Sequence, residues 1–170
     1  MQVRKTIAAV IGAATILLTA GLASPAFAAY DLVQIQNWNS LKCAAIPGGN
    51  PANYVQAIQF DCGGTGNADR YWERELQYHD QYEHPVYVFR NHLTKKCLTA
   101  AGGNGGPAWQ YNCVAGSANQ EWAYDSGERL HNVGTNRCLA VPAAQLGDGV
   151  KLIQWTCGTG DEQRWYLQDF

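Results

Sequence analysis

The 170-residue sequence lacks the patterns that would indicate catalysis or metal binding. It has no Gly-x-Ser-x-Gly, no His-Glu-x-x-His and no P-loop, and its four histidines are scattered without metal-ligand spacing. No Cys-x-x-Cys occurs, which argues against a structural zinc site. We therefore expect no enzyme activity, no metal and no cofactor.

Positive charge is also scarce. The chain has 12 Lys and Arg against 14 Asp and Glu, and two of the basic residues, Arg4 and Lys5, lie near the N-terminus. This charge balance lacks the excess of positive charge that binding to nucleic acid or anionic lipid requires. After residue 28 no apolar stretch is long enough to cross a bilayer. We predict no nucleic-acid binding, and no membrane insertion once the leader is removed.

Residues 1–28 have the pattern of a secretory signal peptide. The positive start precedes an apolar run, Thr6–Ala23, and Ala26-Phe27-Ala28 supplies a small-x-small cleavage site. A membrane anchor is the alternative, but the run is at the short end for a span. We predict that the leader is removed and that residues 29–170 form one secreted, extracellular domain.

The sequence around the six cysteines repeats three times. Cys43, Cys97 and Cys138 each end the ungapped pattern apolar-x-Asn-x-x-[Ser/Thr]-x-[Lys/Arg]-Cys. The other three cysteines each end apolar-Gln-aromatic-x-Cys, and a tryptophan follows 8 to 10 positions later. Gly, Asn, Pro and Asp break the copies at matching places, and the segments between them are too short for ordinary helices.

Each copy therefore predicts one all-β unit of about four strands. The units cover approximately residues 32–76, 86–126 and 127–168. An inserted connector, Glu73–Pro85, joins the first two, and we interpret its acidic residues as a solvated loop.

The repeat also predicts which cysteines pair with each other. Six cysteines allow 15 pairings, and an oxidising compartment favours bond formation. Equivalent units should each close their own bond, with a loop of 16 to 19 residues that contributes roughly 3 kcal/mol. The predicted pairs are Cys43–Cys62, Cys97–Cys113 and Cys138–Cys157.

A threefold unit with paired cysteines and Gln-x-Trp endings resembles the ricin-B-type (R-type) lectin domain, which includes the family 13 carbohydrate-binding modules. Two units end in Gln120-Glu-Trp122 and Gln163-Arg-Trp165, whereas the first has Arg70-Tyr-Trp72. The resemblance covers residues 32–168 and implies a β-trefoil with pseudo-threefold symmetry. It also implies that the three tryptophans are core residues, each contributing roughly 2–3 kcal/mol.

In that family a unit can hold a sugar pocket. The pocket uses an Asp two positions after the first cysteine, an aromatic two before the second, and the Asn-Gln that leads into Gln-x-Trp. The aromatic face packs on the apolar side of a pyranose, and the polar groups bind its hydroxyls. Here the Asp is lost from every unit, because Ala45, Thr99 and Ala140 occupy its positions.

The second and third units retain more of this set than the first, which has Phe60 with Asp69-Arg70. The predicted sugar-binding residues are Thr99, Tyr111, Asn119 and Gln120 in the second unit, and Trp155, Glu162 and Gln163 in the third. Asp148, in the turn before the third aromatic, is a candidate substitute for the lost carboxylate. The alternative for Tyr111 and Trp155 is a place in the core, on the strand face that each shares with a cysteine.

The resemblance thus predicts a non-catalytic carbohydrate-binding protein with degenerate sites. Its expected partner is a galactose-like or xylan-like glycan or polysaccharide. The alternative is a trefoil that has lost sugar binding and contacts a protein, as an inhibitor or toxin component. The candidate aromatics for that surface are Trp38, Tyr54, Tyr78 and Tyr82.

Overall fold

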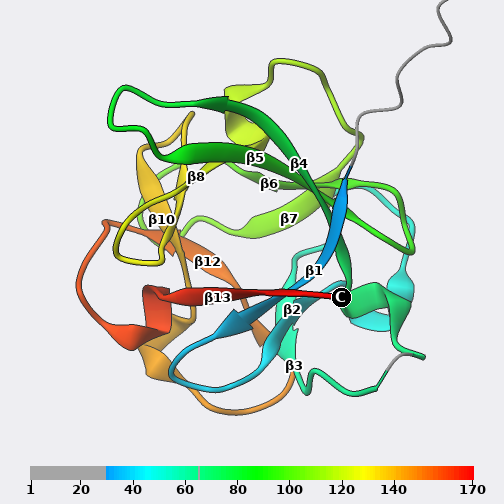
Figure 1. The fold of residues 1–170 in the computed structure, drawn as a ribbon. Helices are drawn as coiled ribbons and strands as arrows, with labels where there is room; N and C mark the ends of the chain where they lie inside the picture. The colour runs from blue at the N-terminus through cyan, green and yellow to red at the C-terminus, as the bar shows by residue number, and fades with distance from the viewer. Residues whose placement is uncertain (1–29, 65) are drawn as a thin grey trace, which may run out of the picture.

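The computed structural model describes residues 30–64 and 66–170, and the predicted leader lies outside this part of the chain. Regular structure in these residues is β-strand or three-residue 3-10 turn (Figure 1). No helix in the described ranges is long and apolar enough to cross a membrane.

Each of the three predicted units forms a lobe with four principal strands. The first lobe contains β1 (Asp31–Asn37), β2 (Cys43–Ala45), β3 (Ile58–Phe60) and β4 (Trp72–His79). The second contains β5 (Pro85–Asn91), β6 (Cys97–Ala100), β7 (Ala108–Tyr111) and β8 (Glu121–Tyr124). The third contains β9 (Leu130–Asn132), β10 (Arg137–Ala140), β12 (Ile153–Trp155) and β13 (Trp165–Asp169), with a further two-residue strand, β11 (Val150–Lys151).

Five 3-10 turns connect the strands at matching places. They are η1 (Pro47–Gly49), η2 (Ala68–Arg70), η3 (Ala118–Gln120), η4 (Pro142–Ala144) and η5 (Asp161–Gln163).

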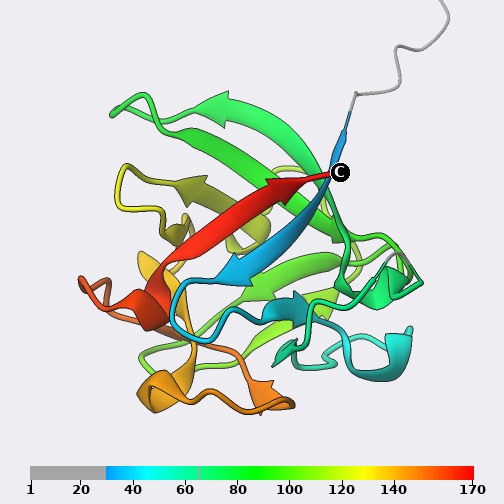
Figure 2. The ribbon, with the colours of Figure 1, turned by 60° about the horizontal axis from the view of Figure 1, so that its bottom comes forward.

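The strands close into a β-trefoil, as predicted. The antiparallel pairs β13–β1, β1–β4, β4–β5, β5–β8 and β8–β9 run around a barrel. A bridge between Arg129 and Arg164 links β9 back to β13. The remaining strands form three hairpins, β2–β3, β6–β7 and β10–β12. Figure 2 turns the molecule by 60° from the view of Figure 1.

The three hairpins pair with one another in a cycle. In each lobe, the residue three positions before the repeated glutamine forms a backbone pair with a residue of the next lobe. That partner is the residue directly before the next lobe's own repeated glutamine. The pairs are Gln56–Trp109, Pro107–Ile153 and Lys151–Ile58. Because every lobe takes its partner from a neighbour, the cycle closes only when all three are present.

The three repeated tryptophans form the centre of the core, as predicted. Trp72, Trp122 and Trp165 are fully buried. Each indole N–H donates to a backbone carbonyl, of Ala44, Leu98 and Leu139 respectively, at 2.9 to 3.0 Å. A buried indole needs such a partner, so the bonds fix the orientation of each ring.

The repeated glutamines join neighbouring lobes. In the second lobe Gln110 is fully buried, and its amide donates to the carbonyls of Asn50 and Ala52 in the first lobe at 2.6 and 2.7 Å. Its carbonyl oxygen accepts from the Thr94 hydroxyl of its own lobe at 2.6 Å. Gln59 and Gln154 make the equivalent bonds. The Ser/Thr and Gln of the repeat therefore satisfy one another inside the structure.

The disulfides are the three predicted ones, each within its own lobe. They join Cys43 to Cys62, Cys97 to Cys113 and Cys138 to Cys157.

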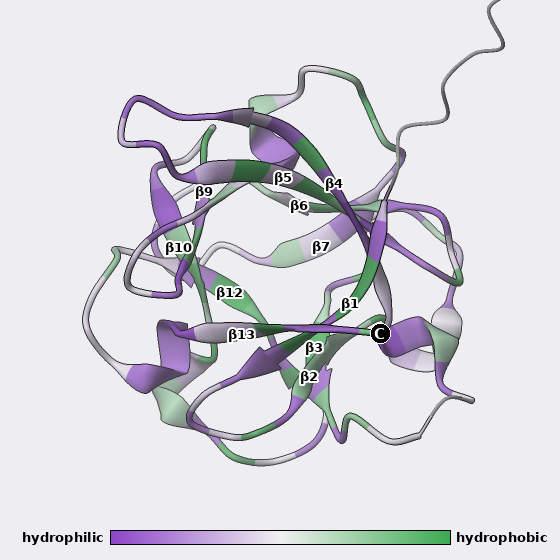
Figure 3. Cartoon of the chain, in the orientation of Figure 1, coloured by the Kyte–Doolittle hydropathy of each residue, from purple (hydrophilic) through white to green (hydrophobic). Residues whose placement is uncertain are grey.

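The prediction of a loop over Glu73–Pro85 is wrong, although residues 76–79 and 81–83 are exposed to solvent as expected. Strands β4 and β5 run through most of this segment as one long hairpin, and only Asp80–His84 forms the turn. Glu73 is only 3% exposed, and its carboxylate pairs with the His92 ring at 3.0 Å and with the Lys95 ammonium. The Lys95 ammonium compensates the burial of the Glu73 carboxylate, which the acidic composition of the segment did not reveal. The tip of the hairpin is hydrophilic (Figure 3).

Candidate functional site

The aromatic residue of the third lobe points outward. In β12 Gln154 is fully buried, whereas Trp155 is 46% exposed. Successive side chains of a strand face opposite sides, and the inner side is taken by the glutamine that joins the lobes. The core interpretation of Trp155 is therefore wrong, and its indole is available at the surface.

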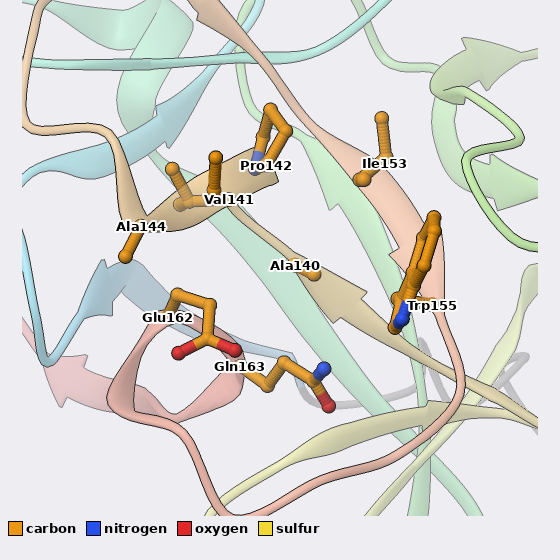
Figure 4. Close-up of a pocket in the computed structure, with 9 residues that line it drawn as sticks. Ala140, Val141, Pro142, Ala144, Ile153, Trp155, Glu162 and Gln163 are labelled. Carbon is orange, nitrogen blue, oxygen red and sulfur yellow. The ribbon is translucent and has the colours of Figure 1, made fainter.

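Trp155 borders a hollow with a volume of about 410 Å³ (Figure 4). Turn η4 forms one wall with Val141, Pro142 and Ala144, and Ala140 lies between this wall and Trp155. The η4 wall was not predicted from the sequence, because proline and alanine carry no functional group to mark them.

The η4 backbone has an unusual conformation. Ala143 and Ala144 have positive φ angles of 49° and 51°. Their counterparts in the first lobe are Gly48 and Gly49, which reach φ of 60° without a side-chain penalty. Strained residues of this kind gather at functional sites, where the surroundings hold them in place.

Turn η5 brings two of the predicted sugar-binding residues, Glu162 and Gln163, to the hollow. Gln163 is nearly buried, and its amide accepts from Gly158 N–H at 2.8 Å and donates to the Thr156 carbonyl at 3.2 Å. It therefore fixes the loop before η5 while lining the hollow.

Glu162 supplies a carboxylate to the same hollow. Its backbone carbonyl accepts from Asn37 Nδ2 at 3.1 Å and from Val141 N–H at 3.0 Å, so its position is fixed from two sides. Glu162 and Trp155 lie on opposite sides of Ala140 (Figure 4). The hollow thus combines an aromatic face, an apolar wall and a negative charge.

Asp148 is not among the residues that line this hollow. Its carboxylate binds the Lys42 ammonium at 2.8 Å and accepts from Asp61 N–H at 2.9 Å, both in the first lobe. These contacts hold the pKa of the Asp148 carboxyl below its usual value. Asn53 and Asn104 make the equivalent backbone bond at the other two lobe boundaries. Asp148 therefore makes this repeated type of backbone bond between the third and first lobes.

The second lobe brings two of its four predicted residues to the surface. Thr99 and Gln120 are buried and bonded to each other at 3.1 Å, and Gln120 also accepts from Val114 N–H at 2.8 Å. Asn119 is exposed and Tyr111 is half-buried.

In the first lobe the aromatic face is covered. Arg70 stands where the other lobes have a glutamine, and its guanidinium lies 4.8 Å from the centre of the Phe60 ring. A cation over a ring is a favourable contact. It occupies the face on which a ligand would pack.

No described residues group three or more His, Cys, Asp or Glu side chains as a metal site would.

Several solved structures share this fold with TM-scores above 0.6, and three of them illustrate the likeness. The designed threefold-symmetric protein ThreeFoil matches at TM-score 0.72 and 23% identity, over 82% of this chain and 99% of that chain. The C-half of an earthworm R-type lectin in complex with GalNAc matches at 0.63 and 18%, over 82% and 99%. The exo-β-1,3-galactanase 1,3Gal43A from Clostridium thermocellum matches at 0.71 and 21%, over 82% and 30%.

The sequence itself matches the ricin-type β-trefoil lectin domain over residues 31–165. This range spans all three lobes, from β1 to the first residue of β13. The chain belongs to the ricin-type β-trefoil lectin domain family.

Proposed function

We propose that this protein is a secreted, non-catalytic lectin whose third lobe binds a pyranose sugar against Trp155. The observation that carries the proposal is the exposed indole beside a hollow of about 410 Å³. That volume lies within the range of small-molecule sites, and an aromatic face packs well on the C–H side of a sugar ring. Secretion rests on the predicted leader.

Glu162 takes over the role of the Asp that the family has at the Ala140 position. A carboxylate accepts charge-assisted hydrogen bonds from two vicinal hydroxyls, and each such bond contributes roughly 1.5–3 kcal/mol. In a shallow site that binds at about 1 mM, losing one would abolish measurable affinity. The Glu162 carboxylate, on the side of the hollow opposite Trp155, accepts hydrogen bonds from the hydroxyls of a sugar that stacks on the indole.

The expected ligand is a galactose-like sugar at the end of a glycan. Two solved structures of similar fold are described as complexes of an earthworm lectin with GalNAc and with 6'-sialyllactose. A xylan-like polymer is the second candidate.

A glycan array probed with the purified protein and three variants tests the proposal. Wild-type protein should give saturable signals that free galactose or xylose competes away. We expect Trp155→Ala to lose at least tenfold in affinity and Glu162→Gln roughly tenfold, because the neutral amide keeps the shape but loses the charge. Trp38→Ala is the control, because Trp38 is exposed but lies outside the hollow. Equal signals from wild type and Trp155→Ala would contradict the site.

The alternative function is protein binding through the β4–β5 hairpin. Tyr78 and Tyr82 are exposed on it and border a second hollow of about 780 Å³. A folded wild-type protein that gives no binding signal on the glycan array would favour this alternative.

A further inference from the structure

The three lobe boundaries contain the same two-residue contact in three chemical forms. The first residue of each pair accepts, through its side-chain oxygen, a hydrogen bond from a backbone N–H of the next lobe. The second residue donates its own N–H to the carbonyl of the repeated glutamine in that lobe, at 2.9 Å in every case. The three pairs are Asn53-Tyr54, Asn104-Gly105 and Asp148-Gly149.

The second boundary has the one Asn-Gly pair of the sequence, Asn104-Gly105. In such a pair the backbone nitrogen of the glycine can attack the carbonyl carbon of the asparagine side chain, because no Cβ obstructs the approach. A C–N bond forms, ammonia leaves, and the product is a five-membered succinimide. Water then opens the ring to aspartate or isoaspartate. The net reaction consumes one water, releases one ammonia and replaces a neutral amide by a carboxylate.

The surroundings of the Asn104 side chain favour this attack. Its Oδ1 accepts from Thr156 N–H at 2.7 Å and from Arg137 Nε at 3.0 Å. The negative charge that develops on this oxygen therefore meets a backbone N–H and a guanidinium, as in an oxyanion hole. The Asn104 Nδ2, which leaves as ammonia, lies 3.0 Å from the Thr156 hydroxyl oxygen.

The attacking nitrogen is accessible to solvent but restrained. Asn104 and Gly105 are both exposed, so water can reach the succinimide. The Gly105 N–H donates to the Gln154 carbonyl at 2.9 Å, and this bond has to open before the nitrogen turns toward the side chain. The restraint makes the conversion a slow ageing reaction of the folded protein.

The third boundary already has the product of such a conversion. The Asp148 carboxylate binds the Lys42 ammonium at 2.8 Å. Lys42 and Arg137 are equivalent in the repeat, since each directly precedes the first cysteine of its lobe. An aspartate at position 104 would therefore find its counter-ion in place.

The first boundary lacks both features that favour the reaction. Asn53 is followed by Tyr54, whose side chain hinders the approach of the backbone nitrogen. Lys96, the equivalent cation of the repeat, donates to Asn112 Oδ1 at 2.6 Å, whereas Asn53 Oδ1 accepts from the Asn112 N–H. This boundary is an internal control within the same chain.

We propose that Asn104 is a self-modification site of the folded protein, where attack by the Gly105 nitrogen and hydrolysis by water leave an aspartate or isoaspartate paired with Arg137. The site borders the third-lobe hollow, because a Cβ added to Gly105 would lie 3.6 Å from Cζ3 of Trp155. An isoaspartate lengthens the backbone by one methylene at this contact. Its effect on sugar binding rests on the proposed function, whereas the modification itself does not.

Peptide mass mapping of purified protein tests the proposal. Protein aged at mildly alkaline pH is digested at mildly acidic pH, and the peptide with residue 104 should gain the mass difference between NH2 and OH. The Asn53 peptide should stay unchanged. Arg137→Gln should slow the conversion about tenfold, because the oxygen loses a charged donor, whereas Arg137→Lys should keep most of the rate.

Two further variants create the same pair at the other boundaries. Asp148→Asn places an Asn-Gly pair beside Lys42 and should revert to aspartate at a rate close to that of Asn104. Tyr54→Gly creates an Asn-Gly pair whose side-chain oxygen accepts from a backbone N–H. Without the charged donor it should convert about tenfold more slowly than Asn104.

Each measurement has a result that would overturn the proposal. An unmodified Asn104 after ageing would remove the site, whatever the array shows about sugar binding. Equal rates in wild type and Arg137→Gln, or in all three Asn-Gly pairs, would show that the boundary geometry does not matter. A destabilised Arg137→Gln protein would convert faster, because unfolding frees the Gly105 nitrogen, so a slower rate cannot come from unfolding.

The melting temperature of Asn104→Asp tests how the product fits. We expect it to equal or exceed that of the wild type, because Arg137 pairs with the new carboxylate as Lys42 pairs with Asp148. A melting temperature lower by several degrees would show that the boundary rejects the product, and would overturn the proposed pairing.

Discussion

The first and third lobes share a scaffold but differ at the surface. Both bury a tryptophan and a glutamine through the same bonds, and both place an aromatic residue after that glutamine. In the third lobe this ring is open beside a carboxylate, whereas in the first lobe Arg70 covers it. Between these two lobes, the residue at the end of the 3-10 turn, Arg70 or Gln163, marks the difference in how far the aromatic face is covered.

The two tryptophans of the third lobe provide the sharpest version of this comparison. Trp165→Ala removes a fully buried, hydrogen-bonded indole, and we expect the free energy of unfolding to fall by about 3–5 kcal/mol. Trp155→Ala removes a half-exposed one and should cost less than about 1 kcal/mol. Urea denaturation followed by circular dichroism measures both. Similar losses would contradict the division between scaffold and surface.

Arg70→Gln would give the first lobe the glutamine that the other lobes have. The Nε of Arg70 is buried without a hydrogen-bond partner, whereas Gln120 and Gln163 bond to the backbone of their own loops. We expect the free energy of unfolding to rise by about 1 kcal/mol, because new hydrogen bonds replace an unsatisfied donor. Urea denaturation of wild type and variant checks this. A decrease would show that the contact between Arg70 and Phe60 stabilises the lobe.

Asp148→Asn should have the smallest effect. It gives the third boundary a carboxamide, as Asn53 and Asn104 provide at the other two. The lowered pKa of Asp148 means that its contribution is complete well above pH 3.8 and is lost as the pH falls through the folded-state value. Melting temperatures measured from pH 6 to pH 2 should therefore fall less steeply for the variant. Parallel curves would show that the Lys42 pair does not contribute.

The repeat made most of the fold predictable. Three copies with fixed offsets gave the lobes, the disulfides and the tryptophan core, because each of these depends on residue identity at a repeated position. The long β4–β5 hairpin was missed, since its acidic residues look solvated until the Lys95 ammonium and the His92 ring that contact Glu73 are seen.

The candidate site was predictable only in part. The family resemblance pointed to Trp155 and Glu162, but it did not show that both line one hollow on opposite sides of Ala140. Thr99 and Gln120 matched the family positions, yet the structure uses them in a buried bond.

The cyclic pairing of the hairpins has a consequence for how this chain unfolds and diverges. Each lobe depends on its neighbour for strand partners and for the carbonyls that satisfy a buried amide. Removing any one lobe would break two of the three boundaries, so we expect the domain to melt in a single cooperative transition. None of these contacts uses the outward-facing rings. Selection can thus alter the three surfaces independently, while the interior stays under a common constraint.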